Sequence, residues 1–265
     1  MNHLSSATEQ SLLRSDADGV TTLTLNRPAA RNALSMALME ALDSELVAIA
    51  AEPGVRVVIL AGAGPAFCAG HDLREMRANP SREVYEATFA LCARLMQRIT
   101  ALPQPVIARV HGIATAAGCQ LVAAADLAVA ADTARFATPG VDIGLFCSTP
   151  AVALVRAVGR KPAMEMLLTG QPIGAARARE IGLVNRVVPE AVLDAEVATL
   201  ARQIASKSPL ALTMGKQGFY RQAEMDLKDA YACASAIMVR NMLTHDATEG
   251  IDAFLTKRAP VWTGT

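Results

Sequence analysis

The sequence predicts an α/β fold in which strand-strand-helix units wind into a superhelix, followed by a C-terminal helical region. Two short apolar runs, Val55–Leu60 and Pro105–Val110, have the length of buried strands, and each runs into a turn of small residues. The order strand, strand, helix then repeats, and right-handed crossovers wind such units into a superhelix. We therefore assign residues 1–190 to the superhelical core and residues 191–265 to the helical region.

The first elements are a hairpin and a capped helix. Gly19–Leu25 alternates and is rich in β-branched residues, which predicts a strand paired with Leu12–Arg14. Asn26–Asn32 is interpreted as a turn. Ser35 is expected to cap a helix of about four turns that ends before Pro53.

The middle of the chain continues the same pattern. A polar patch, Arg74–Arg82, is expected to be mobile, and Ser81 is predicted to cap a helix that reaches Leu102. A helix from Pro150 is predicted with Ser148 or Thr149 as its cap. Between these helices we expect two short strands and a loop, Leu127–Ala131, Arg135–Ala137 and Thr138–Gly144.

The pattern becomes wholly helical from about Ala191. Helices with no sheet to cover usually pack on the core or on another subunit, so we expect an oligomer. The predicted helices are Leu193–Ser206, Leu210–Gln222, Asp226–Leu243 and Glu249–Leu255.

The two small-residue turns are the candidate site. One is Ala61–Gly70, which follows the first buried strand, and the other is Thr115–Cys119, which begins a helix. Unpaired amides at such strand ends can place two N–H donors around one oxygen, the geometry of an oxyanion hole. The alternative is that Ala and Gly merely permit tight helix packing.

Composition limits the classes of function. The 265 residues are 52% hydrophobic and 19% charged, with 25 basic and 25 acidic side chains. This balance does not suggest a nucleic acid or an anionic membrane as partner. The longest apolar stretch, Leu121–Ala131, is too short to span a bilayer, so no membrane insertion is expected. The first 20 residues lack an apolar or Arg-rich leader pattern and contain Glu9, so we expect a cytoplasmic protein.

Cysteine and histidine spacing gives no sign of a metal. The five cysteines lack a C-x-x-C pair and fall in apolar surroundings, which indicates reduced, buried thiols. The four histidines have no metal-ligand spacing, and we predict no metal site. They are His3, His71, His111 and His245.

Three blocks resemble the enoyl-CoA hydratase/isomerase, or crotonase, superfamily. They are Ala66–Met76 (AFCAGHDLREM), Val110–Asp126 and Thr169–Pro189, and the resemblance extends over nearly the whole chain. Gly70–Leu73, Ala114–Leu121 and Phe136–Pro150 are most similar to one subgroup, that of enoyl-CoA hydratase domain-containing protein 3. The resemblance implies a crotonase-like ββα superhelix that binds an acyl-CoA thioester, and a homotrimer or dimer of trimers built with the C-terminal helices.

The resemblance also implies site residues. By position, the two oxyanion donors are the backbone amides of His71 and Ala117. The coenzyme A part of the ligand, with no permanently bound cofactor, is implied to lie near the positions Arg31, Ala69, Asp72, Leu73, Lys257 and Arg258.

The sequence departs from the family where hydratases carry two glutamates. Hydration of an enoyl thioester needs one group to activate water and one to protonate the α-carbon. The first glutamate position holds Gln120 and the second holds Gly140. Gln has no titratable proton near neutral pH, and Gly has no side chain. Each acid/base group contributes about 10²–10⁴-fold in rate. Ordinary hydration is therefore not expected.

Two functions stay open. The first is a CoA-thioester lyase, isomerase or hydrolase of fatty-acid or acyl-CoA metabolism that uses the hole. In it Asp142, Cys147 or the substrate moves protons, although a structural Asp and an inert buried Cys are the alternatives for those residues. His71 could also offer its ring, unless the imidazole is simply hydrogen-bonded to a carboxylate such as Asp72. The second is a non-catalytic or regulatory acyl-CoA-binding protein.

Overall fold

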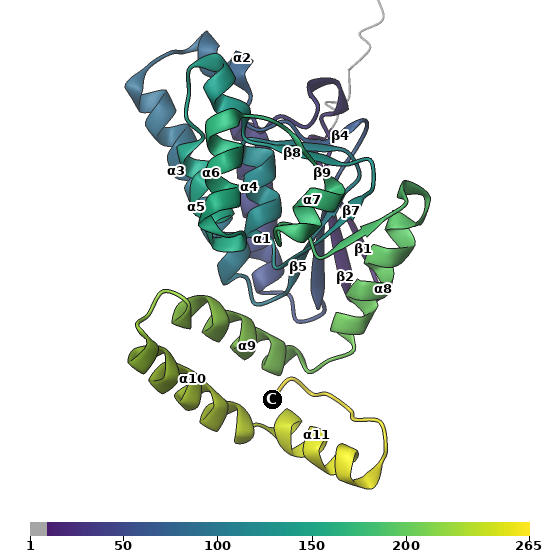
Figure 1. The fold of residues 1–265 in the computed structure, drawn as a ribbon. Helices are drawn as coiled ribbons and strands as arrows, with labels where there is room; N and C mark the ends of the chain where they lie inside the picture. Colours follow the sequence, from purple (N-terminus) through teal and green to yellow (C-terminus); the bar gives the residue numbers. More distant parts are fainter. Residues whose placement is uncertain (1–9) are drawn as a thin grey trace, which may run out of the picture.

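Two β-sheets form the centre of the molecule (Figure 1). The computed structural model describes residues 10–265, so His3 and Glu9 lie outside the described residues. The larger sheet runs β1 (Leu12–Ala17), β2 (Val20–Leu25), β3 (Val57–Gly62), β5 (Val106–Val110), β7 (Leu127–Ala131) and β10 (Arg186–Val188). The smaller sheet runs β4 (Ala66–Cys68), β6 (Ile113–Thr115), β8 (Arg135–Ala137) and β9 (Ile173–Gly174).

Helices surround the sheets and continue beyond them. The α-helices are α1 (Met36–Ala50), α2 (Leu73–Ala78), α3 (Arg82–Ala101), α4 (Ala117–Ala124), α5 (Ser148–Ala157), α6 (Arg160–Thr169), α7 (Ala175–Glu180), α8 (Leu193–Ala205), α9 (Pro209–Gln222), α10 (Leu227–Met242) and α11 (His245–Thr256). Short 3₁₀ turns are η1 (Pro28–Ala30), η2 (Pro139–Ile143) and η3 (Glu190–Val192). None of the helices within residues 10–265 has the length and apolar character needed to span a bilayer.

The predicted superhelix of strand-strand-helix units is confirmed. Three successive units place their first strands, β3, β5 and β7, side by side and parallel in the larger sheet. Their second strands, β4, β6 and β8, are side by side and parallel in the smaller sheet. The turn that joins each second strand to its helix therefore lies beside the same turn of the next unit.

The strand β3 is buried on both faces of the larger sheet, because its apolar side chains alternate between two clusters. Val58 and Leu60 of β3 belong to the main core, whereas Val57 and Ile59 pack on a second cluster with α8. A strand buried on both faces reads as a continuous apolar run, as VRVVIL does. The first of the predicted C-terminal helices, α8, thus covers a sheet face, and the helices without a sheet to cover begin at α9.

Capping residues set several helix boundaries. Ser35 and Ser81 accept hydrogen bonds from Leu38 N–H and Val84 N–H, as predicted. Residues 74–78 of the polar patch belong to α2, which Asp72 caps. The prediction that Ser148 or Thr149 caps a helix is wrong: α5 begins at Ser148, whose hydroxyl donates to the carbonyl of Phe146.

Helix α9 is fixed to the body by a buried cation. Lys216 Nζ, on a side chain only 7% exposed, donates to the carbonyls of Ile99 and Gln104 at 2.9 Å and lies 2.7 Å from Asp126 Oδ2. The same carboxylate accepts from the backbone N–H of Val106, at the start of β5. Beyond this anchor, α10 and α11 lie below the body in Figure 1.

Candidate active site

In the turn that follows β4, the backbone N–H of His71 points away from Leu34. His71 pairs with Leu34 in a parallel bridge. Leu34 N–H donates to Gly70 O at 2.7 Å, and Asp72 N–H donates to Leu34 O at 3.0 Å. In such a bridge the N–H of the middle residue points to the opposite side. Among residues 10–265 this N–H has no hydrogen-bond acceptor.

The second turn leaves the amide of Ala117 free. Ala117 is the first residue of α4, where N–H groups have no partner within the helix. No acceptor for it is found in the described part of the chain. The preceding Ala116 adopts φ 50° and ψ −118° while its own N–H donates to Ala137 O at 2.9 Å. A strained residue held by a neighbouring strand therefore aims the start of α4.

The two turns touch each other through glycines. A Cβ atom on Gly70 would lie 2.9 Å from Ala116 Cβ and 3.3 Å from Ala117 N, and Gly70 has φ +90°. A Cβ atom on Gly118 would lie 2.1 Å from Cys68 O. Thr115 Oγ1 also donates to Ala69 O at 3.1 Å. Residues without side chains therefore let two turns, each carrying a free amide, meet backbone to backbone.

The His71 imidazole is neutral and packs on an aromatic ring. It lies edge-on to Phe89 of α3, with ring centroids 5.4 Å apart and planes at 90°. Burial lowers the pKa of His71 to about 4. Its Nε2 is buried with no partner within residues 10–265. The alternative of a hydrogen bond to Asp72 is wrong, because that carboxylate pairs with Arg27 at 2.9 Å.

Gln120, which the family resemblance places at the first hydratase glutamate, lies on α4. It is 4% exposed, and its Oε1 accepts from the Cys92 thiol at 3.8 Å. Phe89 and Cys92 are one turn apart on α3, so His71 and Gln120 contact the same face of that helix. Both are neutral hydrogen-bonding groups at pH 7.

Gly140, which the family resemblance places at the second hydratase glutamate, has no room for a side chain. A Cβ atom on Gly140 would lie 2.7 Å from Leu145 O and 2.9 Å from Cys147 Sγ. Leu145 N–H also donates to Gly140 O at 2.8 Å, which closes the loop on itself. The loop from Gly140 to Cys147 thus fills the space that a carboxylate at this position would need.

The other proton-carrying candidates lie apart or are inactive. Asp142 is exposed in η2, and its carboxylate oxygens lie 3.1 Å from the Cβ position of Gly170, at the end of α6. Burial raises the pKa of Cys119 to about 12 and that of Cys147 above its usual value, so both are thiols at neutral pH. Cys68 and Cys92 are also buried, and Cys233 is half-buried. No group of three or more His, Cys, Asp or Glu within residues 10–265 is arranged to hold a metal ion.

The positions implied to contact coenzyme A fall into two separate groups. Arg31 and Ala69 are neighbours, because Ala69 N–H donates to Arg31 O at 3.0 Å, and Leu73 begins α2. Lys257 and Arg258 follow α11, at the end of the molecule opposite α2 (Figure 1). Arg258 also pairs with Glu249 at 2.6 and 2.7 Å. One chain alone does not bring the two groups together.

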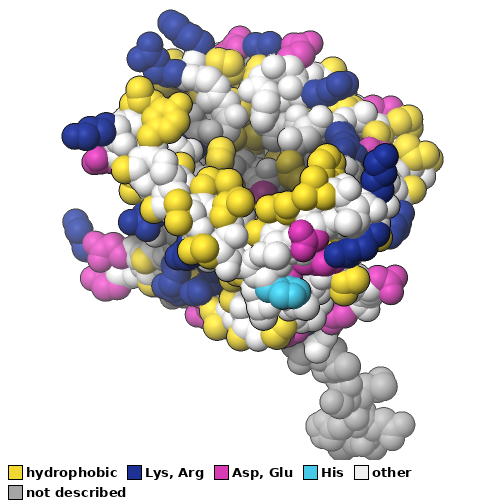
Figure 2. Space-filling view, turned by 90° about the horizontal axis from the view of Figure 1, so that it is seen from below, with side chains coloured by type: hydrophobic (Ala, Val, Ile, Leu, Met, Phe, Trp, Pro, Cys, Tyr) yellow, Lys and Arg dark blue, Asp and Glu magenta, His cyan; other side chains and the backbone are white. Residues whose placement is uncertain are grey.

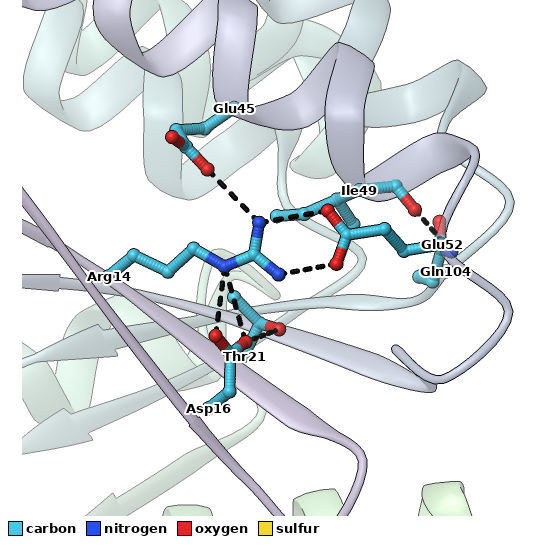
Figure 3. A network of polar contacts seen from close by, with 7 residues as sticks. All are labelled: Arg14, Asp16, Thr21, Glu45, Ile49, Glu52 and Gln104. Carbon is cyan, nitrogen blue, oxygen red and sulfur yellow. Dashed lines mark hydrogen bonds and ion pairs between the residues drawn. The ribbon is translucent and has the colours of Figure 1, made fainter.

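The two cavities described in residues 10–265 lie elsewhere. A cavity of about 760 Å³ is lined by residues of α9 and α10, among them Met214 and Ile237. Another of about 540 Å³ lies at the β1–β2 hairpin. There Arg14 binds Glu52, Asp16 and Glu45, as Figure 3 shows. Neither cavity is lined by His71 or Ala117.

Comparison with known proteins identifies the family. The model of the family "Enoyl-CoA hydratase/isomerase" matches residues 15–265. The chain belongs to this family. Human "Enoyl-CoA hydratase domain-containing protein 3, mitochondrial" is 49% identical over 92% of this chain and 81% of its own length. This confirms the resemblance seen in the sequence, including the subgroup.

Solved structures of this family share the fold. The crystal structure of an enoyl-CoA hydratase of Mycobacterium smegmatis has a TM-score of 0.94 and 56% identity, covering 96% of this chain and 99% of that one. That of human enoyl-CoA hydratase domain-containing protein 3 has a TM-score of 0.93 and 47% identity, covering 96% and 100%. The crotonase-like fold predicted for the chain is thereby confirmed.

The prediction of a cytoplasmic protein is contradicted. Relatives from rat, mouse, human, Xenopus laevis and Danio rerio, between 46% and 49% identical to the chain, are all named as mitochondrial. The prediction rested on a missing leader pattern in the first 20 residues. A missing pattern carries no positive information about location.

Sequence reasoning also missed several residues around the two turns. Phe89 and Cys92 gave no signal beyond an apolar helix face, although they contact His71 and Gln120. Arg27 and Asn32 stood in a segment interpreted only as a turn. An Asn between Arg and Ala could have been flagged as a turn residue tolerant of positive φ, and Asn32 has φ 55°.

Proposed function

We propose that the protein binds acyl-CoA thioesters and polarises the thioester carbonyl between the amides of His71 and Ala117. The observation that carries this proposal is the contact of Gly70 with Ala116 and Ala117, which brings together two turns with free amides. Members of a family named for enoyl-CoA substrates act on CoA thioesters, which fits this ligand. Coenzyme A then enters as part of the substrate.

The chemistry follows from where charge develops. When a thioester becomes an enolate, or when a nucleophile adds to it, negative charge gathers on the carbonyl oxygen. Two fixed N–H donors stabilise that charge without reorganising, and the positive end of α4 adds to the effect. One such donor is typically worth about 10²–10³-fold in rate.

We assign the protein to the CoA-thioester lyase and isomerase class, with ordinary hydration excluded from the proposal. Gln120 cannot give up a proton, and Gly140 faces a loop with no space for a carboxylate. Catalysis then rests on the hole, with the substrate or water moving the protons. A thioester hydrolase would use the same two amides for a tetrahedral intermediate.

A non-catalytic acyl-CoA-binding protein is the second candidate. It is favoured by the neutral state of His71, the protonated cysteines and the filled space beside Gly140. A panel of acyl-CoAs distinguishes the two candidates through thioester absorbance and free thiol. Binding without any change in either signal would support the second.

We propose a homotrimer or dimer of trimers formed by α9–α11. Helix α10 has no buried residue, and Leu227, Leu243 and Phe254 are 75%, 82% and 82% exposed. Figure 2 shows hydrophobic side chains gathered around a hollow on the side of the molecule seen from below. Exposed apolar area of this kind marks an interface.

A neighbouring copy would also bring Lys257 to the group formed by Arg31 and Ala69. The expected solution mass is three or six chains, and a monomer at micromolar concentration would contradict the proposal.

Acetoacetyl-CoA tests the hole without requiring turnover. This β-keto thioester ionises to an enolate that absorbs in the ultraviolet, and two amide donors should raise its enolate-to-keto ratio at least about 10²-fold over that of free ligand. The enolate-to-keto ratio should rise about tenfold per pH unit throughout pH 5–8, as expected when only the ligand loses a proton. His71, with a pKa of about 4, and Cys119, with a pKa of about 12, keep their charge in this range. A bound ligand with the ratio of free ligand would overturn the proposed function.

A further inference from the structure

The segment from Arg27 to Leu34 supports the turn that carries His71. It lies against residues 66–72 through the bridge between Leu34 and His71. Two side chains of the segment, those of Arg27 and Asn32, add polar contacts on either side of that bridge. Neither side chain was assigned a role above.

Asn32 anchors the strand that leads into the turn. It is completely buried, and its Nδ2 donates to Ala66 O at 2.8 Å and to Phe67 O at 3.2 Å. Its Oδ1 accepts from Arg27 N–H at 2.9 Å. A buried carboxamide with all these partners is costly to disturb, because each lost bond leaves a buried polar group unpaired. Asn32 thus fixes β4, three residues before His71.

Arg27 anchors the other side of His71. One of its guanidinium nitrogens donates to the carbonyl of Ala33, and Nη2 pairs with Asp72 Oδ2 at 2.9 Å. The two side chains are 28% and 13% exposed. Asp72 directly follows His71 and also caps α2 through the N–H groups of Arg74 and Glu75, at 3.1 and 3.2 Å. One carboxylate therefore joins the turn both to the Arg27 segment and to α2.

We propose that the Arg27–Asp72 ion pair is a positioning element that holds the His71 amide toward the Ala117 amide. The inference rests on the proposed function, since it assumes that these amides are the donors. Because Asp72 is the next residue along the chain, a shift of its carboxylate rotates the His71 peptide. A misplacement of about 1 Å at such a site can cost 10²-fold in rate.

Stability alone is an alternative role for the pair, and the chain offers a matched control. Asp43 of α1 pairs with Arg98 of α3, with side chains 14% and 30% exposed. This pair resembles Arg27–Asp72 in burial and chemistry, and Asp43 also accepts from Arg94 at 3.4 Å, but the pair joins two helices and does not hydrogen-bond to residues 66–72. Loss of either pair should cost comparable stability.

Asp72→Asn tests the inference in the full chain. Asn is as good an N-cap as Asp, so α2 keeps its cap while the ion pair loses its charge. We expect the enolate-to-keto ratio of bound acetoacetyl-CoA to fall by about tenfold or more in Asp72→Asn, and by less than about twofold in Asp43→Asn. The ratio is compared at saturating ligand in both variants, so that a contact of Asp72 with coenzyme A, which would change only the affinity, does not enter the comparison. Thermal midpoints of both variants measure the structural cost.

Each result has a defined meaning. Equal ratios in Asp72→Asn and Asp43→Asn would overturn the positioning role. If Asp72→Asn loses affinity for coenzyme A while the enolate-to-keto ratio stays unchanged, Asp72 contacts the ligand directly and the positioning role is overturned. If wild type itself shows no enolate, the proposed function and this inference both fall. Should Asp72→Asn not fold, Arg27→Lys keeps the charge but cannot reach both Ala33 and Asp72, and it should lower the ratio in the same direction.

Discussion

Gly70→Ala should lower the enolate-to-keto ratio of bound acetoacetyl-CoA by about 10²–10³-fold, the effect of losing one oxyanion donor. The added methyl would lie 2.9 Å from Ala116 Cβ and 3.0 Å from Thr115 O, closer than real side chains approach such atoms. The two turns must therefore separate, which moves the His71 amide away from Ala117. Ultraviolet titration with acetoacetyl-CoA measures the change.

Gly144→Ala is the matched control for this variant. Gly144 has φ +77°, comparable to the +90° of Gly70, but a Cβ atom there would meet nothing within 4 Å. Both variants pay the cost of an L-residue at positive φ, of order 1 kcal/mol. Only Gly70→Ala forces the turns apart. A ratio that stays high in Gly70→Ala would exclude these two amides as a joint site.

Crotonyl-CoA should be hydrated about 10⁴–10⁸-fold more slowly by this protein than by a relative carrying both glutamates, because each acid/base group contributes about 10²–10⁴-fold. Loss of the enoyl-thioester absorbance measures the rate. Hydration at the rate of such a relative would contradict the prediction that Gln120 and Gly140 prevent ordinary hydration.

Restoring the glutamates should not restore hydration. Gln120→Glu introduces one carboxyl at a buried position, where desolvation favours its neutral form. It can regain at most the rate contribution of one acid/base group, about 10²–10⁴-fold. Gly140→Glu should lower the thermal midpoint instead, since its side chain meets Leu145 O and Cys147 Sγ. Gly54→Glu, at a position with nothing within 4 Å, is the control that should leave stability nearly unchanged.

Local sequence signals predicted much of the fold. The strands Leu127–Ala131 and Arg135–Ala137 have the predicted bounds, and Ser35 and Ser81 cap the predicted helices. These features depend on residues within one turn or strand, so propensity and capping chemistry determine them. The family resemblance supplied the positions of the two amides, while the chemistry of small-residue turns suggested why amides are needed there.

Long-range packing set what the sequence did not predict. The short strands β4 and β6 were not predicted, and they are defined by pairing across the smaller sheet, β4 with β6 and β6 with β8. The helix α5 begins earlier than its hydroxyl residues suggested, because Ser148 bonds Phe146 instead of capping. The crowding of Gly140 by Cys147, and the pairing of Asp72 with Arg27, join residues that are apart in the chain. No local pattern encodes such contacts.

The buried ammonium of Lys216 connects the C-terminal helices to the strand that leads toward Ala117. It binds Asp126, which also holds the first residue of β5, and β5 leads through β6 directly into Ala117. In the oligomer that we propose, a displacement of α9 would therefore reach the start of β5, the strand that leads through β6 to Ala117. We therefore expect dissociation of the proposed oligomer to weaken the proposed site although none of its residues is changed.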